Sequence, residues 1–284
     1  MKKVLVAGAT GYLGRYVIKE LKKQGFWVRA LARNSKMVVD PGGDIDEVFE
    51  GDVTNPETLS GILNGIDYVI SSIGITRQKD GFTYMDVDYR GNKNLLDIAI
   101  KTNVSKFIFV SVINAHLLSE LKIIQAKERF VDELKASKLD YAVIRPAGFF
   151  SDMLEFLDMA EKGKVYLFGD GENEINPIHG RDLAEICVDA IYEKETDITV
   201  GGPVVYTYKE IAELAFKIAE KKVSISSIPE WMIRIILPFM RRLTSPKRYG
   251  PIEFMMKVTT MDVIGELYGK ERLENHFQKN YARH

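Results

Sequence analysis

The sequence is poor in cysteine, in net charge and in long apolar segments, and each shortage excludes something. Its one cysteine, Cys187, cannot form a disulfide within the chain, which fits a reducing compartment. Lysine and arginine (39) nearly balance aspartate and glutamate (40), so a net charge of −1 gives no general attraction to nucleic acid. No apolar run reaches the roughly 18 residues needed to span a bilayer.

The composition is that of an ordinary folded protein. Hydrophobic residues make up 46% of the 284 residues and charged residues 28%, which excludes wholesale disorder. Cys187 lies in an apolar pattern of helical spacing and is interpreted as a buried structural thiol. The chain enters an apolar segment within its first residues, so we expect no signal peptide. We therefore expect a cytoplasmic protein.

The most informative feature is a glycine-spaced loop between a strand-like and a helix-like segment. Residues 4–7 are a short apolar run typical of a buried parallel strand, and Gly8, Gly11 and Gly14 follow. A tight turn, the close approach of a pyrophosphate and the packing of helix on strand each require a residue without a Cβ. The helix that follows would point its free N–H groups at phosphate. The loop therefore predicts a dinucleotide site.

Strand-like and helix-like segments alternate from the start, which predicts an α/β protein with a doubly wound parallel sheet of the Rossmann type. The expected strands are residues 3–7, 27–32, 46–50, 67–72, 105–111 and 140–145. The expected helices are residues 12–25, 56–64, 90–102 and 120–138, with later ones near 180–193 and 208–221. We expect an NAD(P)-binding domain at 1–150 and a smaller C-terminal α/β lobe at 151–284, from which some elements could return to the sheet.

The end of the second expected strand carries a cation. An NAD-selective site has a carboxylate there, which accepts a hydrogen bond from the adenosine ribose. Here the residue is Arg33, Lys36 follows closely, and the first acid is Asp40. A cation favours the 2′-phosphate, so we expect NADP, with NAD the lesser alternative. The other interpretation of Arg33 is a solvated charge at a strand end.

Several segments resemble one family, the short-chain dehydrogenase/reductases, and within it the atypical, NmrA-like members. The loop reads Gly-Ala-Thr-Gly-x-Leu-Gly. Residues 50–53 are similar to the segment that contacts adenine in this family, and residues 71–74 to the loop beside the cofactor. Residues 139–146 are similar to the strand whose end approaches the nicotinamide. The resemblance covers nearly the whole chain and is compatible with a homodimer formed through two long helices beside the sheet.

The glycine loop, the strand end and the resemblance together imply one set of cofactor contacts. The expected residues are Gly8, Thr10, Gly11, Tyr12, Leu13, Gly14, Arg33, Asp52, Val53, Ser72, Ile73, Gly74, Lys127 and Pro146. We expect no metal site.

The resemblance also implies a Tyr-x-x-x-Lys pair with an upstream serine, in which the tyrosine donates a proton and the lysine holds the nicotinamide ribose. Ser111 ends the fifth expected strand, and Lys127 lies in the next expected helix. The position four before Lys127 is Ile123, which has no proton to give, and no tyrosine occurs between Tyr89 and Tyr141. Lys127 can still bind the ribose; its alternative is a solvated helix lysine.

Two residues remain as catalytic candidates, each with a plain alternative. Ser111 could orient a substrate oxygen, or its hydroxyl could only cap the end of the strand through a hydrogen bond. His116 follows in the loop expected to border the nicotinamide and titrates in a suitable range, but a loop histidine is commonly a surface residue. His179 either lines the rim of the pocket or begins a helix.

An apolar segment with interspersed arginines occupies residues 229–243, and it allows three interpretations. It is a helix that packs on the second lobe and breaks near Pro238, or a methionine-rich lid over a large hydrophobic substrate. The third interpretation is peripheral membrane contact through an amphipathic, basic face.

The sequence therefore favours an NADP-dependent oxidoreductase that transfers hydride to an apolar small molecule without the usual tyrosine. The proton would come from another side chain or from water. The alternative is a non-catalytic NADP-binding redox sensor, regulator or assembly factor. Loss of the tyrosine favours this alternative, whereas Ser111 and Lys127 favour the enzyme.

Overall fold

A parallel sheet forms the centre of the computed structural model, which describes residues 1–38, 40, 42–75, 78 and 81–282. In this part of the chain, eight strands lie in the order β12-β9-β6-β5-β4-β1-β2-β3, and all neighbours are parallel. The predicted doubly wound parallel sheet is confirmed. The strands are β1 (Lys3–Ala7), β2 (Trp27–Ala32), β3 (Glu47–Glu50), β4 (Tyr68–Ser71), β5 (Lys106–Val110), β6 (Asp140–Pro146), β9 (Asp197–Gly201) and β12 (Glu266–Leu267).

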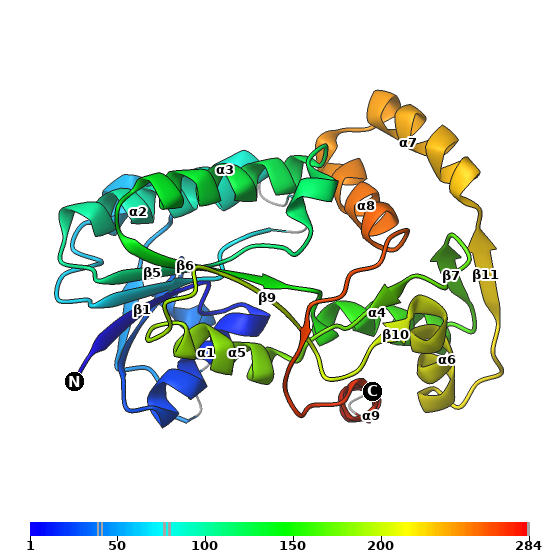
Figure 1. The fold of residues 1–284 in the computed structure, drawn as a ribbon, viewed down its shortest axis with the longest axis horizontal. Coiled ribbons are helices and arrows are strands. Elements are labelled where there is room, and N and C mark those ends of the chain that lie inside the picture. The colour runs from blue at the N-terminus through cyan, green and yellow to red at the C-terminus, as the bar shows by residue number, and fades with distance from the viewer. Residues whose placement is uncertain (39, 41, 76–77, 79–80, 283–284) are drawn as a thin grey trace.

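Helices cover both faces of this sheet (Figure 1). One face carries α1 (Tyr12–Lys23) and α5 (Gly180–Asp189), and the other carries α2 (Asn92–Lys101) and α3 (Lys122–Ala136). Alternate residues of β1 point to opposite faces, so Val4 packs in the α1 and α5 layer while Leu5 packs in the α2 and α3 layer. Both are fully buried, which explains why the parallel strands are continuous apolar runs.

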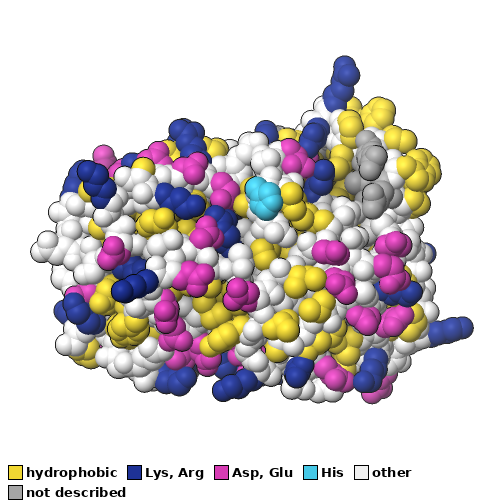
Figure 2. Space-filling model, viewed as in Figure 1, with side chains coloured by type: hydrophobic (Ala, Val, Ile, Leu, Met, Phe, Trp, Pro, Cys, Tyr) yellow, Lys and Arg dark blue, Asp and Glu magenta, His cyan; other side chains and the backbone are white. Residues whose placement is uncertain are grey.

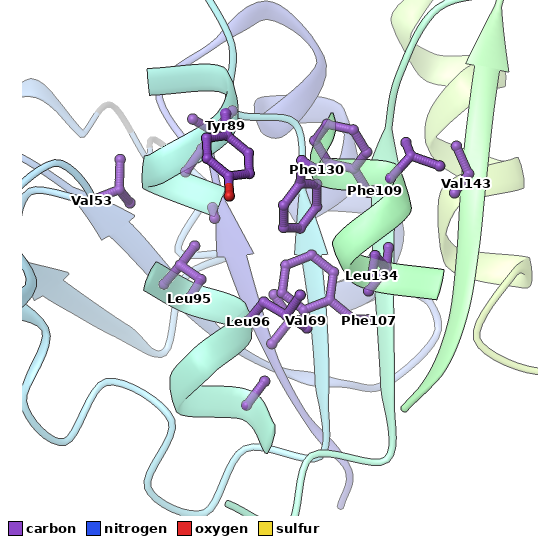
Figure 3. Packing of buried hydrophobic residues seen from close by; sticks show 14 of the residues in the cluster. Val53, Val69, Tyr89, Leu95, Leu96, Phe107, Phe109, Phe130, Leu134 and Val143 are labelled. Atoms are coloured by element: carbon purple, nitrogen blue, oxygen red, sulfur yellow. The ribbon is translucent and has the colours of Figure 1, made fainter. Parts of the chain in front are cut away.

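Aromatic side chains fill the layer beneath α3, as Figure 3 shows. The Phe130 ring of α3 lies over the rings of Phe107 and Phe109 of β5, at centroid distances of 5.7 and 4.6 Å. Val69 and Leu134 complete this contact, and all five side chains are buried. This packing fixes α3 against the sheet and so fixes the residues that α3 presents near the carboxyl ends of the strands.

Two of the expected helices differ from the structure. Residues 56–64 contain only a short 3-10 turn, η2 (Pro56–Leu59), because Gly61 and Gly65 adopt positive φ angles of 79° and 69° that end any helix. Before α2 the chain forms a π-helix, η3 (Met85–Gly91). The other short turns are η1 (Ser35–Met37) and η4 (Ala115–Leu118).

The chain after residue 150 forms a side lobe and also returns to the sheet. Strands β9 and β12 extend the central sheet, while β7 pairs with β11 and β8 pairs with β10. The lobe has its own apolar cluster, which includes Phe150, Phe156 and Phe216. Its elements are α4 (Phe150–Glu161), β7 (Val165–Phe168), β8 (Glu174–Ile175), β10 (Tyr206–Thr207), α6 (Tyr208–Ile218), β11 (Ile225–Ile228) and α9 (Leu273–Tyr281).

The apolar segment after residue 229 forms α7 (Glu230–Leu243), and α8 (Pro246–Val258) follows it. The expected break at Pro238 is wrong, because α7 continues through this residue. Pro238 lies on an exposed side of α7, so its ring meets no packed neighbour there. No helix in the described ranges is long and apolar enough to cross a bilayer.

One buried side chain joins the returning segments to the sheet. The Asn176 amide donates to the carbonyl oxygens of Gly202 (3.2 Å) and Gly265 (3.0 Å), and its oxygen accepts from the Gly265 N–H (2.9 Å). Asn176 is fully buried, so none of these groups can turn to water instead.

We predict that Asn176→Ala lowers the free energy of unfolding by about 2–4 kcal/mol, because it leaves buried backbone groups without partners. Urea denaturation measures the change. Asn55→Ala is the matched control, since Asn55 is exposed and its side chain makes no capping bond, and it should change stability by less than about 0.5 kcal/mol. Equal effects of the two substitutions would contradict this role for Asn176.

Candidate functional site

A cavity of about 860 Å³ opens at the carboxyl ends of β1, β4, β5 and β6. The start of α1 and the loops after these strands form one side of it, and α4 and α8 form the other. The carboxyl edge of a doubly wound sheet is where such folds bind ligands. The cavity contains eight of the sequence-predicted site residues: Gly11, Tyr12, Leu13, Ser72, Gly74, Ser111, Lys127 and Pro146.

The glycine loop joins β1 to α1 by a very close approach. Gly8 has a φ of +91°, and a Cβ on Gly14 would lie 2.2 Å from the Gly8 carbonyl oxygen. These two glycines therefore serve the turn and the packing of the helix on the strand. Gly11 is different, because it is exposed, begins α1 and lines the cavity, and a Cβ there would meet only the Gly8 oxygen at 3.1 Å. The space beside Gly11 suits a phosphate group at the N-terminus of α1.

Lys127 reaches the cavity wall from α3 and is held there by an aspartate. Its Nζ lies 3.0 Å from Oδ1 of the fully buried Asp88, and Oδ2 of Asp88 accepts from the Ile75 N–H. Burial raises the pKa of Asp88, and the adjacent Lys127 ammonium opposes this shift. A Cβ on Gly74 would lie 2.7 Å from both charged groups, so this residue must also be small. Sequence reasoning missed Asp88, since nothing in its spacing indicates that it is buried.

Ser111 lines the cavity but its hydroxyl hydrogen already has an acceptor. The hydroxyl donates to Glu128 Oε1 at 2.6 Å. Glu128 in turn binds the Arg145 guanidinium through both carboxylate oxygens, at 2.8 and 2.9 Å, and Arg145 also donates to Asp197. In this arrangement Ser111 can accept a hydrogen bond from a ligand, while donation to a ligand would require the bond to Glu128 to break.

The usual tyrosine position is occupied by Ile123, which lines the cavity. His116, the other catalytic candidate, is exposed on η4 and does not line the cavity. His179 begins α5, where its Nδ1 accepts from the Arg181 N–H, which agrees with the helix-start interpretation.

The cavity contains an acid that sequence reasoning missed. Asp152, in the first turn of α4, lines the cavity and its side chain is exposed to it. Partial desolvation by the cavity walls and the negative charge of Glu155 raise its pKa to about 6, while the hydrogen bonds from the Phe149 N–H and from Ser151 oppose the shift. Tyr208 also lines the cavity, but its hydroxyl donates to the Val258 carbonyl oxygen and burial raises its pKa. Asp152 is thus able to exchange a proton near neutral pH.

Arg33, the cation that the sequence indicated, directly follows the end of β2. Arg33 is exposed just before η1, and Lys36 is exposed within it. Asp40, the nearest acid in the sequence, accepts from the backbone N–H groups of Asp44 and Ile45 and so belongs to its own loop.

The remaining expected contacts lie outside the cavity wall. Asp52 accepts from the N–H and the hydroxyl of Thr54, while Val53 and Ile73 are buried in the layer beneath α2 and α3. Thr10 belongs to the loop between β1 and α1. In the described part of the chain, no group of three histidine, cysteine, aspartate or glutamate side chains is placed to hold a metal ion.

The family model described as NAD(P)H-binding matches residues 8–194, more than half of the chain. The chain belongs to this family. The resemblance to the atypical short-chain dehydrogenase/reductases is thereby confirmed, and this chain has an NAD(P)H-binding Rossmann fold.

Two similar proteins have different roles in their names. The photosystem II assembly factor Ycf39 of Trieres chinensis is 27% identical over 82% of this chain and 74% of its own length. The divinyl chlorophyllide a 8-vinyl-reductase of Zea mays is 28% identical over 97% of this chain and 78% of its own length. The fold is also that of the NADPH-dependent quinone oxidoreductase QOR2 of Escherichia coli, with a TM-score of 0.70, 17% identity and coverage of 99% of both chains.

We predict that Gly11→Val weakens NADPH binding by at least about 100-fold, because the side chain fills the space of the pyrophosphate. The free energy of unfolding should change by less than about 1 kcal/mol, since Gly11 is exposed. Calorimetric titration and urea denaturation measure the two quantities.

The control is Gly14→Ala, whose added Cβ meets backbone atoms and should cost about 2 kcal/mol or more of stability. Unchanged NADPH affinity in Gly11→Val would contradict the assignment of the loop.

Proposed function

We propose that the protein is an NADP-dependent oxidoreductase that reduces a conjugated C=C bond of an apolar small molecule. The observation that carries this proposal is the cavity that continues from the glycine loop, past Lys127, into an apolar chamber. NADPH, when bound, would supply the hydride. Gly11 and the start of α1 would bind its pyrophosphate, and Lys127 would donate to its nicotinamide ribose.

The walls of the cavity favour an apolar substrate. They include Leu118, Met153, Phe168, Phe254 and Met255, which come from the loop after β5, from the side lobe and from α8. A pocket that is mostly apolar with a few polar groups is typical of a small-molecule site. Methionine and phenylalanine can adapt to an irregular substrate surface.

The polar groups of the cavity favour an alkene over an isolated carbonyl. Reduction of a carbonyl develops negative charge on oxygen, which needs a hydrogen-bond donor nearby. The two positions that usually supply this donor do not supply it here, because Ile123 has no polar group and the Ser111 hydroxyl donates to Glu128. Reduction of a conjugated C=C bond places the proton on carbon. Asp152 and Glu155 are the acids that line the cavity, and Asp152, with its pKa raised to about 6, is suited to give this proton. The 8-vinyl-reductase among the similar proteins is consistent with this reaction class.

A second candidate function is that of a non-catalytic, NADP-binding assembly factor or regulator. The similarity to the assembly factor Ycf39 favours it as strongly as the similarity to the reductase favours an enzyme. The absence of the tyrosine at Ile123 fits either function. A protein of this kind would bind NADPH and oxidise it with none of the substrates tested.

We predict that the protein binds NADPH more tightly than NADH. Arg33→Ala should weaken the binding of NADPH by about tenfold or more and leave the binding of NADH unchanged. The reason is the loss of a charge-assisted bond to the 2′-phosphate. Arg90→Ala is a suitable control, since Arg90 is also exposed but lies on η3. Calorimetric titration with both cofactors decides the question, and equal affinities of the unmodified protein would refute the preference.

We predict that the protein oxidises NADPH with conjugated alkenes and fails to do so with plain ketones and aldehydes. Asp152→Asn should lower turnover by about 100-fold, the usual contribution of a general acid. In the unmodified protein, turnover should fall as pH rises through about 6, where Asp152 loses its proton. The pH profile of Asp152→Asn should not show this fall. The assay follows NADPH absorbance over a substrate panel and a pH series.

Ile123→Tyr tests the same mechanism in the opposite direction. It restores a phenol four residues before Lys127 and should add weak ketone reduction. Rapid ketone turnover by the unmodified protein would overturn the proposed reaction. NADPH binding without any turnover would favour the assembly factor.

A further inference from the structure

The α7 helix carries an unusual row of exposed apolar side chains. Trp231, Ile235, Phe239 and Leu243 recur every four residues and are 63%, 52%, 62% and 77% exposed. We call these four residues the α7 apolar face. Figure 2 shows hydrophobic side chains gathered at the upper right of the molecule, where α7 lies in Figure 1. Apolar side chains scattered singly need no explanation, but a continuous row along one helix marks an interaction site.

The opposite side of α7 is fixed to the protein, so the exposure of this face is not a fraying end. Leu237 is buried with Met256 of α8, and Phe168 and Ile228 pack against the two. The Arg241 guanidinium also donates to the carboxylate of Glu253, which is buried on α8. These contacts orient the helix, and the α7 apolar face therefore points away from the lobe.

Between Glu230 and Glu253, the charged residues of the α7 and α8 segment are all cations. The sequence from 231 to 252 contains five arginine and lysine residues and no aspartate or glutamate: Arg234, Arg241, Arg242, Lys247 and Arg248. Arg242 is exposed and follows Trp231 by about three helical turns, which places it on the same side as the α7 apolar face. An apolar face that contains tryptophan and has the exposed cation Arg242 on the same side is complementary to anionic lipid headgroups above an acyl layer.

The length of α7 limits how it can meet a bilayer. Its 14 residues extend about 21 Å, which is shorter than the roughly 30 Å of a hydrocarbon core. A helix of this length and pattern lies in the interface with its apolar side in the acyl boundary.

We propose that the α7 apolar face docks the protein on an anionic lipid surface, with α7 parallel to the membrane plane. The next helix, α8, supplies Pro251, Ile252 and Met255 to the wall of the cavity. Docking therefore brings this wall close to the acyl layer, from which an apolar molecule could enter. The lipid contact itself rests only on α7 and holds whether or not the protein is an enzyme.

The test uses the full chain with one tryptophan as reporter. The sequence has two tryptophans, so Trp27→Phe leaves Trp231 as the only one. Vesicles of equal parts phosphatidylcholine and phosphatidylglycerol should shift the Trp231 emission to shorter wavelength and should carry the protein upward in a flotation gradient. Both effects should weaken as salt concentration rises, because salt screens the headgroup charge.

Ile235→Ser should weaken vesicle binding by about tenfold, since it removes one buried aliphatic side chain from the contact. Ile100→Ser is the matched control, because Ile100 is also an exposed isoleucine (48%) on a helix, α2, far along the chain from α7. It should leave vesicle binding unchanged. Thermal unfolding confirms that both variants fold.

Three results would overturn the proposal. One is an absence of binding to these vesicles, or equal binding to pure phosphatidylcholine. Another is a dimer in solution that Ile235→Ser dissociates while vesicles have no effect, which would mean that a second copy covers the face. The third is a shift of Trp231 emission on addition of NADPH alone without vesicle binding, which would make α7 a lid.

Discussion

The close approach of α1 to the end of β1 is the constraint on which the site depends. With the Gly8 carbonyl oxygen placed only 2.2 Å from where a Cβ of residue 14 would be, the first turn of the helix lies directly against the strand. This contact aims the free N–H groups of α1 into the cavity and leaves Gly11 at its edge. A larger residue at position 14 would move the helix, and with it the phosphate site.

Most polar groups at the cavity are already paired, and their pairing restricts the chemistry. Lys127 is held by buried Asp88, and Ser111 donates to Glu128, which is itself bound to Arg145. Such pairs orient side chains rigidly, because breaking one would leave a buried charge without a partner. Asp152 is the exception among the acids described here, since it is exposed to the cavity and has a pKa of about 6.

The sequence predicted the central sheet well, because its signals are local. Apolar runs such as residues 4–7 and the glycines at 8, 11 and 14 define strand, turn and helix over short distances. Local signals failed at residues 56–64, where Gly61 and Gly65 end the helix, and at Pro238, through which α7 continues. At residues 56–64 the conformation of the glycines outweighed the apolar pattern, whereas at Pro238 the helical pattern outweighed the proline.

The sequence by itself determined the fold, the glycine loop, the cation at Arg33 and the lack of a tyrosine before Lys127. Each depends on residue type at a short spacing. Only the tertiary structure decided that Asp88 holds Lys127, that Asp152 enters the cavity, and that the apolar residues of α7 face outward. These features join segments far apart in the chain, and burial there follows from how whole layers pack, which no local pattern records.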